Sequence, residues 1–163
     1  MTLSRSRGLI LFAVLAAGAA LATASEPLTN TLSVHRIVRP GATETTEPAS
    51  TARPGDVLEY VAEFRNTGSS TARGLSATLP LPVGTEFLPG SQRPANARGS
   101  LDGVSFEDLP LKRLVKQADG TLHEELVPTR EYRYLRWPAS DLAAGSARSV
   151  SARVTVASGA EVH

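Results

Sequence analysis

Three histidines are the residues of this 163-residue chain best suited to metal chemistry, namely His35, His123 and His163. Copper and zinc sites on β-scaffolds need three or four converging ligands, often two histidines on one face of a strand. No two of these histidines have that spacing. We therefore expect no metal site and no cofactor. A small metal-binding protein or metalloenzyme that uses His35 and His123 is kept as an alternative.

Residues suited to calcium binding or hydrolysis are present, but they lack the spacing that this chemistry requires. Aspartates stand beside turns, at Asp56, Asp102, Asp108, Asp119 and Asp141. None lies in a dense run of acidic residues such as calcium requires, and turn formation explains them better. No serine has the Gly-x-Ser-x-Gly surroundings of a nucleophile elbow, and the chain has no cysteine. The sequence therefore predicts a protein that is not an enzyme, with no catalytic residue.

A short segment rich in tyrosine and arginine (REYRYLRW) ends at Trp137. In a strand, Tyr132, Tyr134 and Arg136 share one face, whereas Leu135 and Trp137 share the other. If the leucine and tryptophan point inward, the tyrosines and the arginine face outward. Both residue types are enriched in protein interfaces, which makes this a candidate partner-contact face. A solvated cross-strand ladder is the simpler interpretation, and it stays open.

The elements that would carry these residues are strands, because apolar and polar residues alternate with a period of two. The clearest case lies near the end of the chain, where valines and an alanine alternate with serines, Arg153 and Thr155. The expected strands are residues 31–38, 57–65, 72–79, 85–88, 132–137 and 147–156. Their short lengths and the turn residues between them are typical of an antiparallel β-sandwich.

The remaining segments connect these strands. Pro40–Pro54 is rich in Thr, Glu, Ala and Pro, and we expect a flexible crossing loop there. Ser91–Gly103 contains several turn residues, which predicts an exposed loop and a second candidate contact region. Within residues 104–128, Asp119-Gly120 favours a hairpin, with a short helix as the alternative.

Residues 1–24 have the layout of a secretory signal peptide. Arg5 and Arg7 precede a 14-residue apolar run, Gly8–Leu21, and Ala22-Thr23-Ala24 forms a small-x-small cleavage site. The run is shorter than the roughly 20 residues of a membrane-spanning helix, although a retained anchor is the alternative. We therefore expect export to the periplasm or the cell surface, without stable membrane insertion after cleavage.

Charge and cysteine content restrict the mature protein further. Cleavage removes two of 17 basic residues and none of 16 acidic ones, so the formal charge changes from +1 to −1. A nearly neutral protein has no net field that attracts nucleic acid, so we expect no nucleic-acid partner. Without cysteine, an exported domain has to be held together by packing alone, which favours regular layers.

Several short motifs follow one another in an order shared with a known family. They are a Pro-Gly-Asp turn at 54–56, a strand centred on Tyr60, an Asn-Thr-Gly turn at 66–68, a strand ending in Leu79-Pro80, Gly84 before Phe87, and a closing segment with Trp137, Leu142, Gly145 and the strand through Val156. The pattern resembles the bacterial conserved-repeat domain known as domain of unknown function eleven. The resemblance covers most of residues 31–157 and implies an immunoglobulin-like module of envelope or surface proteins.

These observations combine into one expectation for the fold and the function. Residues 25–163 are predicted to form a single all-β domain, an immunoglobulin-like antiparallel sandwich of about seven strands. Such a module would be non-enzymatic and would act by contact with an unidentified envelope or surface protein, or as a structural element of the envelope. A periplasmic assembly factor that acts through an edge strand is a further alternative.

Overall fold

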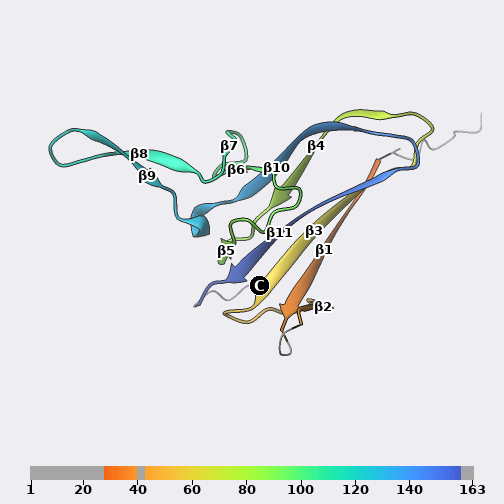
Figure 1. Ribbon diagram of the computed structural model, residues 1–163, viewed down its shortest axis with the longest axis horizontal. Coiled ribbons are helices and arrows are strands. Elements are labelled where there is room, and N and C mark those ends of the chain that lie inside the picture. The colour runs from red at the N-terminus through yellow and green to blue at the C-terminus, as the bar shows by residue number, and fades with distance from the viewer. Residues whose placement is uncertain (1–27, 40–42, 159–163) are drawn as a thin grey trace, which may run out of the picture.

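The computed structural model describes residues 28–39 and 43–158, so the predicted signal peptide lies outside the described residues. The described chain is all-β, with eleven strands and one short 3-10 helix, η1 (Thr129–Glu131). Antiparallel strands form two sheets that pack face to face, and a separate two-stranded hairpin projects from one end of them (Figure 1). The predicted β-sandwich is therefore confirmed as an architecture.

The larger sheet has the strand order β2-β1-β3-β11-β5. Its strands are β1 (Leu28–Val38), β2 (Thr45–Pro48), β3 (Val57–Asn66), β5 (Thr85–Phe87) and β11 (Ala147–Val156). The predicted alternation of β11 is confirmed, because Val150, Ala152, Val154 and Val156 are all buried. This sheet therefore presents one apolar face to the second sheet.

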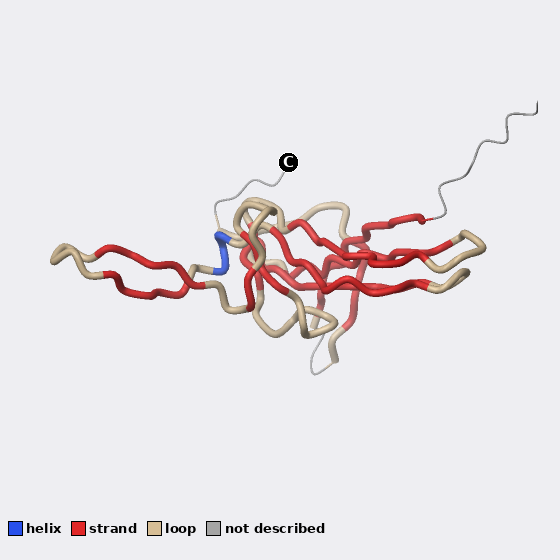
Figure 2. The backbone as a smooth tube through the Cα atoms, turned by 90° about the horizontal axis from the view of Figure 1, so that it is seen from above, coloured by secondary structure: helices blue, strands red, loops and turns tan. Residues whose placement is uncertain are grey.

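The second sheet has the order β4-β10-β6-β7, and the hairpin consists of two further strands. The bounds are β4 (Ala72–Pro80), β6 (Arg98–Ser100), β7 (Glu107–Asp108), β10 (Tyr134–Leu142), β8 (Lys112–Lys116) and β9 (Leu122–Leu126). Seen from above, the hairpin extends away from the two sheets (Figure 2). The hairpin predicted around Asp119-Gly120 is confirmed, and the helical alternative is wrong.

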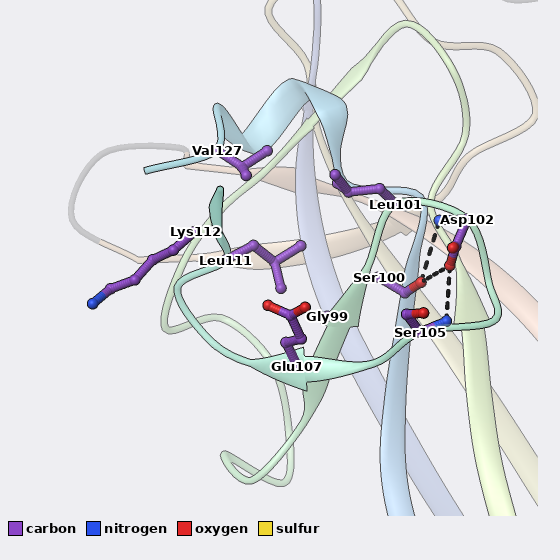
Figure 3. Close-up of a pocket in the computed structure, with 9 residues that line it drawn as sticks. All are labelled: Gly99, Ser100, Leu101, Asp102, Ser105, Glu107, Leu111, Lys112 and Val127. Atoms are coloured by element: carbon purple, nitrogen blue, oxygen red, sulfur yellow. Dashed lines mark hydrogen bonds between the residues drawn. The ribbon is translucent and has the colours of Figure 1, made fainter. Parts of the chain in front are cut away.

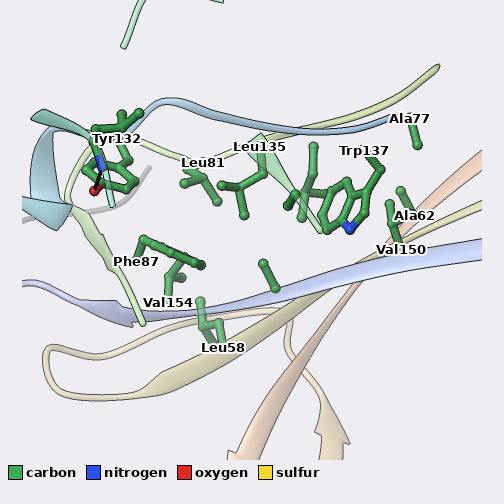
Figure 4. Close-up of a cluster of buried hydrophobic side chains, with 14 of the residues drawn as sticks. Leu58, Ala62, Ala77, Leu81, Phe87, Tyr132, Leu135, Trp137, Val150 and Val154 are labelled. Carbon is green, nitrogen blue, oxygen red and sulfur yellow. Dashed lines mark hydrogen bonds between the residues drawn. The ribbon is translucent and has the colours of Figure 1, made fainter. Parts of the chain in front are cut away.

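The core lies between the two sheets and is filled by aliphatic and aromatic side chains (Figure 4). Leu135 and Trp137 of β10 point into it and are completely buried, as predicted. The Trp137 indole N–H donates to the Pro94 carbonyl over 2.7 Å, so its one polar atom is satisfied. A large apolar ring can therefore occupy the centre of the sandwich without an unpaired donor.

Asn66 ties the end of β3 to the neighbouring turn and to β10. Its side-chain amide donates to the carbonyls of Ser70 and Leu142, each over 2.8 Å, and its side-chain oxygen accepts from the Gly68 amide. The residue is 1% exposed. The turn predicted at 66–68 is thus built around a buried polar side chain whose hydrogen bonds are all made.

Two segments predicted to be loops contain strands. Pro40–Pro54 includes β2, which pairs with the second half of β1. Ser91–Gly103 includes β6, in which Gly99 and Ser100 are buried, so the expectation of an exposed loop is wrong there. Strand β6 (RGS) shows no apolar alternation, because it is defined by pairing with β10 rather than by hydrophobic side chains. The count of about seven strands is therefore too low.

Candidate functional site

The predicted contact face on the Tyr-Arg segment is interrupted, because Tyr132 belongs to the core. It precedes β10, directly after η1, and is only 2% exposed. Its ring stacks on Phe87 with 5.8 Å between centroids, and its hydroxyl accepts a hydrogen bond of 2.8 Å from the Leu111 amide. Burial raises the pKa of the Tyr132 phenol, and the Leu111 hydrogen bond partly opposes this. The outward orientation predicted for Tyr132 is wrong, because the strand begins two residues later.

Tyr134 and Arg136 do lie on the opposite side of β10 from the core, but both are half-buried. The Arg136 guanidinium lies 3.6 Å from the centre of the Phe106 ring, and its Nε donates to Thr78 Oγ1. Gly103 adopts a φ of +77°, and a Cβ there would lie 2.9 Å from a ring carbon of Tyr134. The loop from β6 to β7 therefore covers much of this face. Contact of Tyr134 or Arg136 with a partner stays a prediction.

The projecting hairpin is closed by a tight turn at the residues that predicted it. Gly120 has a φ of +87°, a conformation that glycine adopts without steric cost. Asp119 accepts hydrogen bonds from the hydroxyl and the backbone amide of Thr121, at 2.7 and 2.9 Å. These bonds stabilise the ionised carboxylate and lower the pKa of Asp119. The turn sequence thus contributes to the register of β8 and β9.

Charged pairs link the two hairpin strands to each other and to the body of the protein. Lys112 contacts Glu124 over 2.8 Å, and Arg113 contacts both Glu125 and Glu131. The hydrogen bond from Glu125 and the charge of Glu131 raise the pKa of Arg113. Because Glu131 belongs to η1, Arg113 connects the hairpin to its base.

One face of the hairpin presents leucines to solvent. Leu114, Leu122 and Leu126 lie on the same side, because residues paired across an antiparallel ladder share a face, and each leucine is paired there with a charged residue, Glu124, Lys116 and Lys112 respectively. Their exposed fractions are 66%, 65% and 61%. Within the described chain, neither sheet covers them. Leucines gathered on one exposed face mark a candidate surface for contact with another protein.

The base of the hairpin is anchored in the core and flanked by two pockets. The Val127 amide donates to the Leu111 carbonyl, and both side chains are buried. An apolar pocket of about 360 Å³ lies beside Tyr132 and includes Leu126 of the leucine face among its lining residues. The leucine face therefore continues into a recess at its base.

A second pocket, of about 200 Å³, lies between the β6–β7 segment and the hairpin base (Figure 3). Asp102 is among the residues that line this pocket. Its carboxylate accepts hydrogen bonds from the amides of Val104 and Ser105 and from the Ser100 hydroxyl. These bonds, with the Val104 amide as the largest contribution, lower the pKa of Asp102. Asp102 therefore shapes a turn, as predicted for the aspartates beside turns.

The structure does not bring the two histidines of the metal alternative together. His35 lies in β1, where its Nε2 is 3.2 Å from the Ser33 hydroxyl, and His123 lies in β9 of the projecting hairpin. The two strands are at opposite ends of the molecule (Figure 1). Among the described residues, no group of three His, Cys, Asp or Glu side chains is arranged to hold a metal ion.

The chain matches no protein-family model, no curated protein and no solved structure. In the part of the chain that the structure describes, no helix is long and apolar enough to cross a membrane. The leucine face was missed by sequence reasoning. Leucines do occur on both sides of Asp119-Gly120, at 114, 122 and 126, but their positions do not indicate whether another sheet covers them.

Proposed function

We propose that this protein is an exported, non-enzymatic, immunoglobulin-like module that acts by protein–protein contact at the cell envelope or surface. The observation that carries the proposal is the projecting hairpin, which holds three leucines in solvent on one face. Soluble proteins rarely gather exposed apolar side chains on one projecting element unless something binds there. The partner is an envelope or surface protein.

The construction of the hairpin supports a binding role. Its strands are held in register by the Asp119-Gly120 turn and by ion pairs, and its base is fixed by the Tyr132–Leu111 hydrogen bond. A surface that is ordered before binding loses less conformational entropy on association. The leucine face is therefore suited to bind without refolding.

The immunoglobulin-like and exported parts of the proposal have separate support. The resemblance to the conserved-repeat domain supports the first, together with two packed antiparallel sheets and a buried tryptophan. The second is supported by the apolar run and small-residue site within residues 1–24. The mass of the protein recovered from the envelope fraction tests it, because cleavage predicts a chain that begins at Ser25.

Site-specific photo-crosslinking in intact cells tests the binding role. A photoreactive amino acid at Leu122 samples the leucine face, and the same group at His123 samples the opposite face of the same strand. We expect a discrete adduct with another envelope protein from position 122 and none from position 123. Equal adducts from both positions, or none from either, would contradict a binding role for the leucine face.

Substitution of the leucines provides a complementary measurement. Leu114→Ser combined with Leu122→Ser should abolish an adduct formed from a photoreactive group at position 126. The matched control is Val115→Ser with His123→Ser, a pair on the opposite face, which should leave that adduct in place. Loss of the adduct in both variants would indicate a general disturbance of the hairpin instead of a specific face.

A further inference from the structure

Strand β1 is covered along only half of its outer edge. Strand β2 pairs with His35–Val38, and the Ala49 amide that follows it bonds Val34, whereas residues 28–33 pair with β3 on the inner side only. Figure 1 shows β2 beside one end of β1 and the other end of β1 at the margin of the sheet. The first half of β1 is therefore an open sheet edge within the described chain.

The direction of the backbone groups along this edge follows from one hydrogen bond. The Val34 carbonyl points away from β3, because it accepts from the Ala49 amide over 3.0 Å. In an antiparallel strand this direction recurs at every second residue, so Leu28, Asn30 and Leu32 also point their N–H and C=O groups outward. No described strand pairs with these groups. They form a template for an additional strand.

The other edges of the molecule carry features that discourage strand addition. Strand β4 contains Arg73, a positive-φ Gly74 and a terminal Pro80. Strand β7 has two residues, both acidic, and β8 carries three basic residues. Strand β5 has three residues, and the edge of β11 beyond it is occupied at Ser151 by the bridge to Arg93 and carries the charged Arg148. Such charges, prolines, bulges and short strands are common protections of exposed edges.

The open half of β1 has none of these protections. Leu28–Val34 (LTNTLSV) contains no charge, no proline and no glycine. Leu32, which pairs with buried Ala62 on β3, is 49% exposed although its side chain lies on the core side of the sheet. An apolar side chain on the inner face thus meets solvent at the same place where the backbone is unpaired.

We propose that this edge pairs with the same edge of a second copy of the chain, in antiparallel orientation about a twofold axis at Thr31. In this register Asn30 stands opposite Leu32 of the second copy, and the outward groups of each strand complement those of the other. An uncharged segment can pair with itself without placing like charges opposite each other. Strand addition would also bring a neighbouring strand beside each Leu32. The proposal involves β1 only and is independent of the hairpin.

Sedimentation of the purified full chain, with two matched lysine variants, tests the twofold pairing. Thr31→Lys places two ammonium groups opposite each other at the axis, whereas Thr29→Lys faces Ser33 of the second copy. Both threonines are exposed on the same strand face. We expect the wild-type protein and Thr29→Lys to have twice the monomer mass, and Thr31→Lys to have the monomer mass with the melting temperature of the wild type diluted to its monomer.

Engineered cysteines provide a second readout, which does not depend on tight association. The natural chain has no cysteine, so every disulfide is introduced. Opposed non-hydrogen-bonded residues have Cα atoms about 4.5 Å apart, within the range of a disulfide. The two copies of residue 29 would be offset by about 13 Å at 3.3 Å per residue. Oxidation should therefore link Thr31→Cys into a dimer and leave Thr29→Cys a monomer.

Two results would overturn the proposal. One is a monomeric wild type at every soluble concentration, with no more disulfide from Thr31→Cys than from Thr29→Cys. The other is a disulfide from Thr31→Cys to a different, cysteine-containing envelope protein, which would assign the edge to a strand donated by that protein.

Discussion

The sandwich and the β8–β9 hairpin both place apolar side chains on one strand face, but the two regions bury these side chains to very different extents. In β11 the apolar residues at every second position are buried against the opposite sheet. In the hairpin, Leu114, Leu122 and Leu126 also share one face, yet each is more than 60% exposed. Apolar residues that share a strand face thus form a core in β11, and in the hairpin they form an accessible surface on which charged residues alternate with the leucines.

The difference shows that a strand pattern defines a face, whereas a second layer decides whether that face is buried. The hairpin is joined to the sandwich through a small number of contacts at its base, mainly those of Tyr132, Leu111 and Val127. We therefore expect substitutions to cost most in the sandwich, less at the base and least on the leucine face. Four measurements of the free energy of unfolding test this order.

The largest effect should come from Trp137→Ala. The substitution empties the centre of the core and leaves the Pro94 carbonyl without its indole donor. Replacement of a buried large aromatic by alanine costs about 3–5 kcal/mol. Chemical denaturation measures the change, and a loss below about 1 kcal/mol would show that this part of the sandwich is not a close-packed core.

Asn66→Ala should follow, because it removes the two donors and one acceptor that tie β3 to its neighbours. Leaving the buried Leu142 carbonyl unpaired, together with the loss of the other two bonds, predicts a decrease of about 2–3 kcal/mol in the free energy of unfolding. Asn96→Ala, at an exposed position, is the matched control and should change stability little. Similar values for the two variants would contradict a structural role for the buried amide.

Tyr132→Phe should have an intermediate effect at the base of the hairpin. It preserves the ring that stacks on Phe87 but leaves the buried Leu111 amide unpaired, which predicts a loss of about 1–2 kcal/mol. Because the folded-state pKa of Tyr132 is raised, its contribution is complete below the unfolded value near 10 and is lost as pH rises above it.

The pH dependence provides a control for this variant. Wild-type stability should decrease more steeply above about pH 10 than that of Tyr132→Phe, which has no phenol to ionise at that position. Parallel profiles would show that the phenol of Tyr132 is not responsible. Hydrogen exchange of the β8 and β9 amides should accelerate in Tyr132→Phe more than exchange in β3.

Replacement of any one of the three hairpin leucines by serine should have the smallest effect, within about 0.5 kcal/mol. These side chains already contact water, so little apolar area is lost from the interior. Val150→Ser is the matched comparison, because it places the same hydroxyl in the buried pattern of β11. A large loss at Leu114 or Leu122 would indicate that the hairpin packs against another part of the protein in solution.

Much of the fold could be predicted from the local sequence. The strands at 57–65, 72–79 and 147–156 have nearly the predicted bounds, because turn residues and alternation act over a few neighbouring positions. The hairpin was predicted because Asp119-Gly120 forms its turn independently of the rest of the chain. Strand β6 was missed, because Arg98–Ser100 is a strand only through its pairing with β10.

The candidate contact surfaces were harder to predict from the sequence. Tyr132 was assigned to an exposed face by extending the alternation of β10 past its first residue, but η1 redirects the chain there. The leucine face and the open half of β1 depend on what does not lie beside them, and a strand pattern contains no such information. The sequence spacing of His35 and His123 gave little support for a metal site, and the tertiary structure places the two residues in separate strands.

The sequence by itself determined which segments are strands, where several turns lie and which side chains share a face, because these depend on interactions between near neighbours. Only the tertiary structure decided which faces are covered, that Tyr132 lies inside, and that one half of β1 has a free edge. Burial and edge pairing result from contacts between segments far apart in the chain. The distribution of exposed apolar surface therefore follows from how the layers assemble.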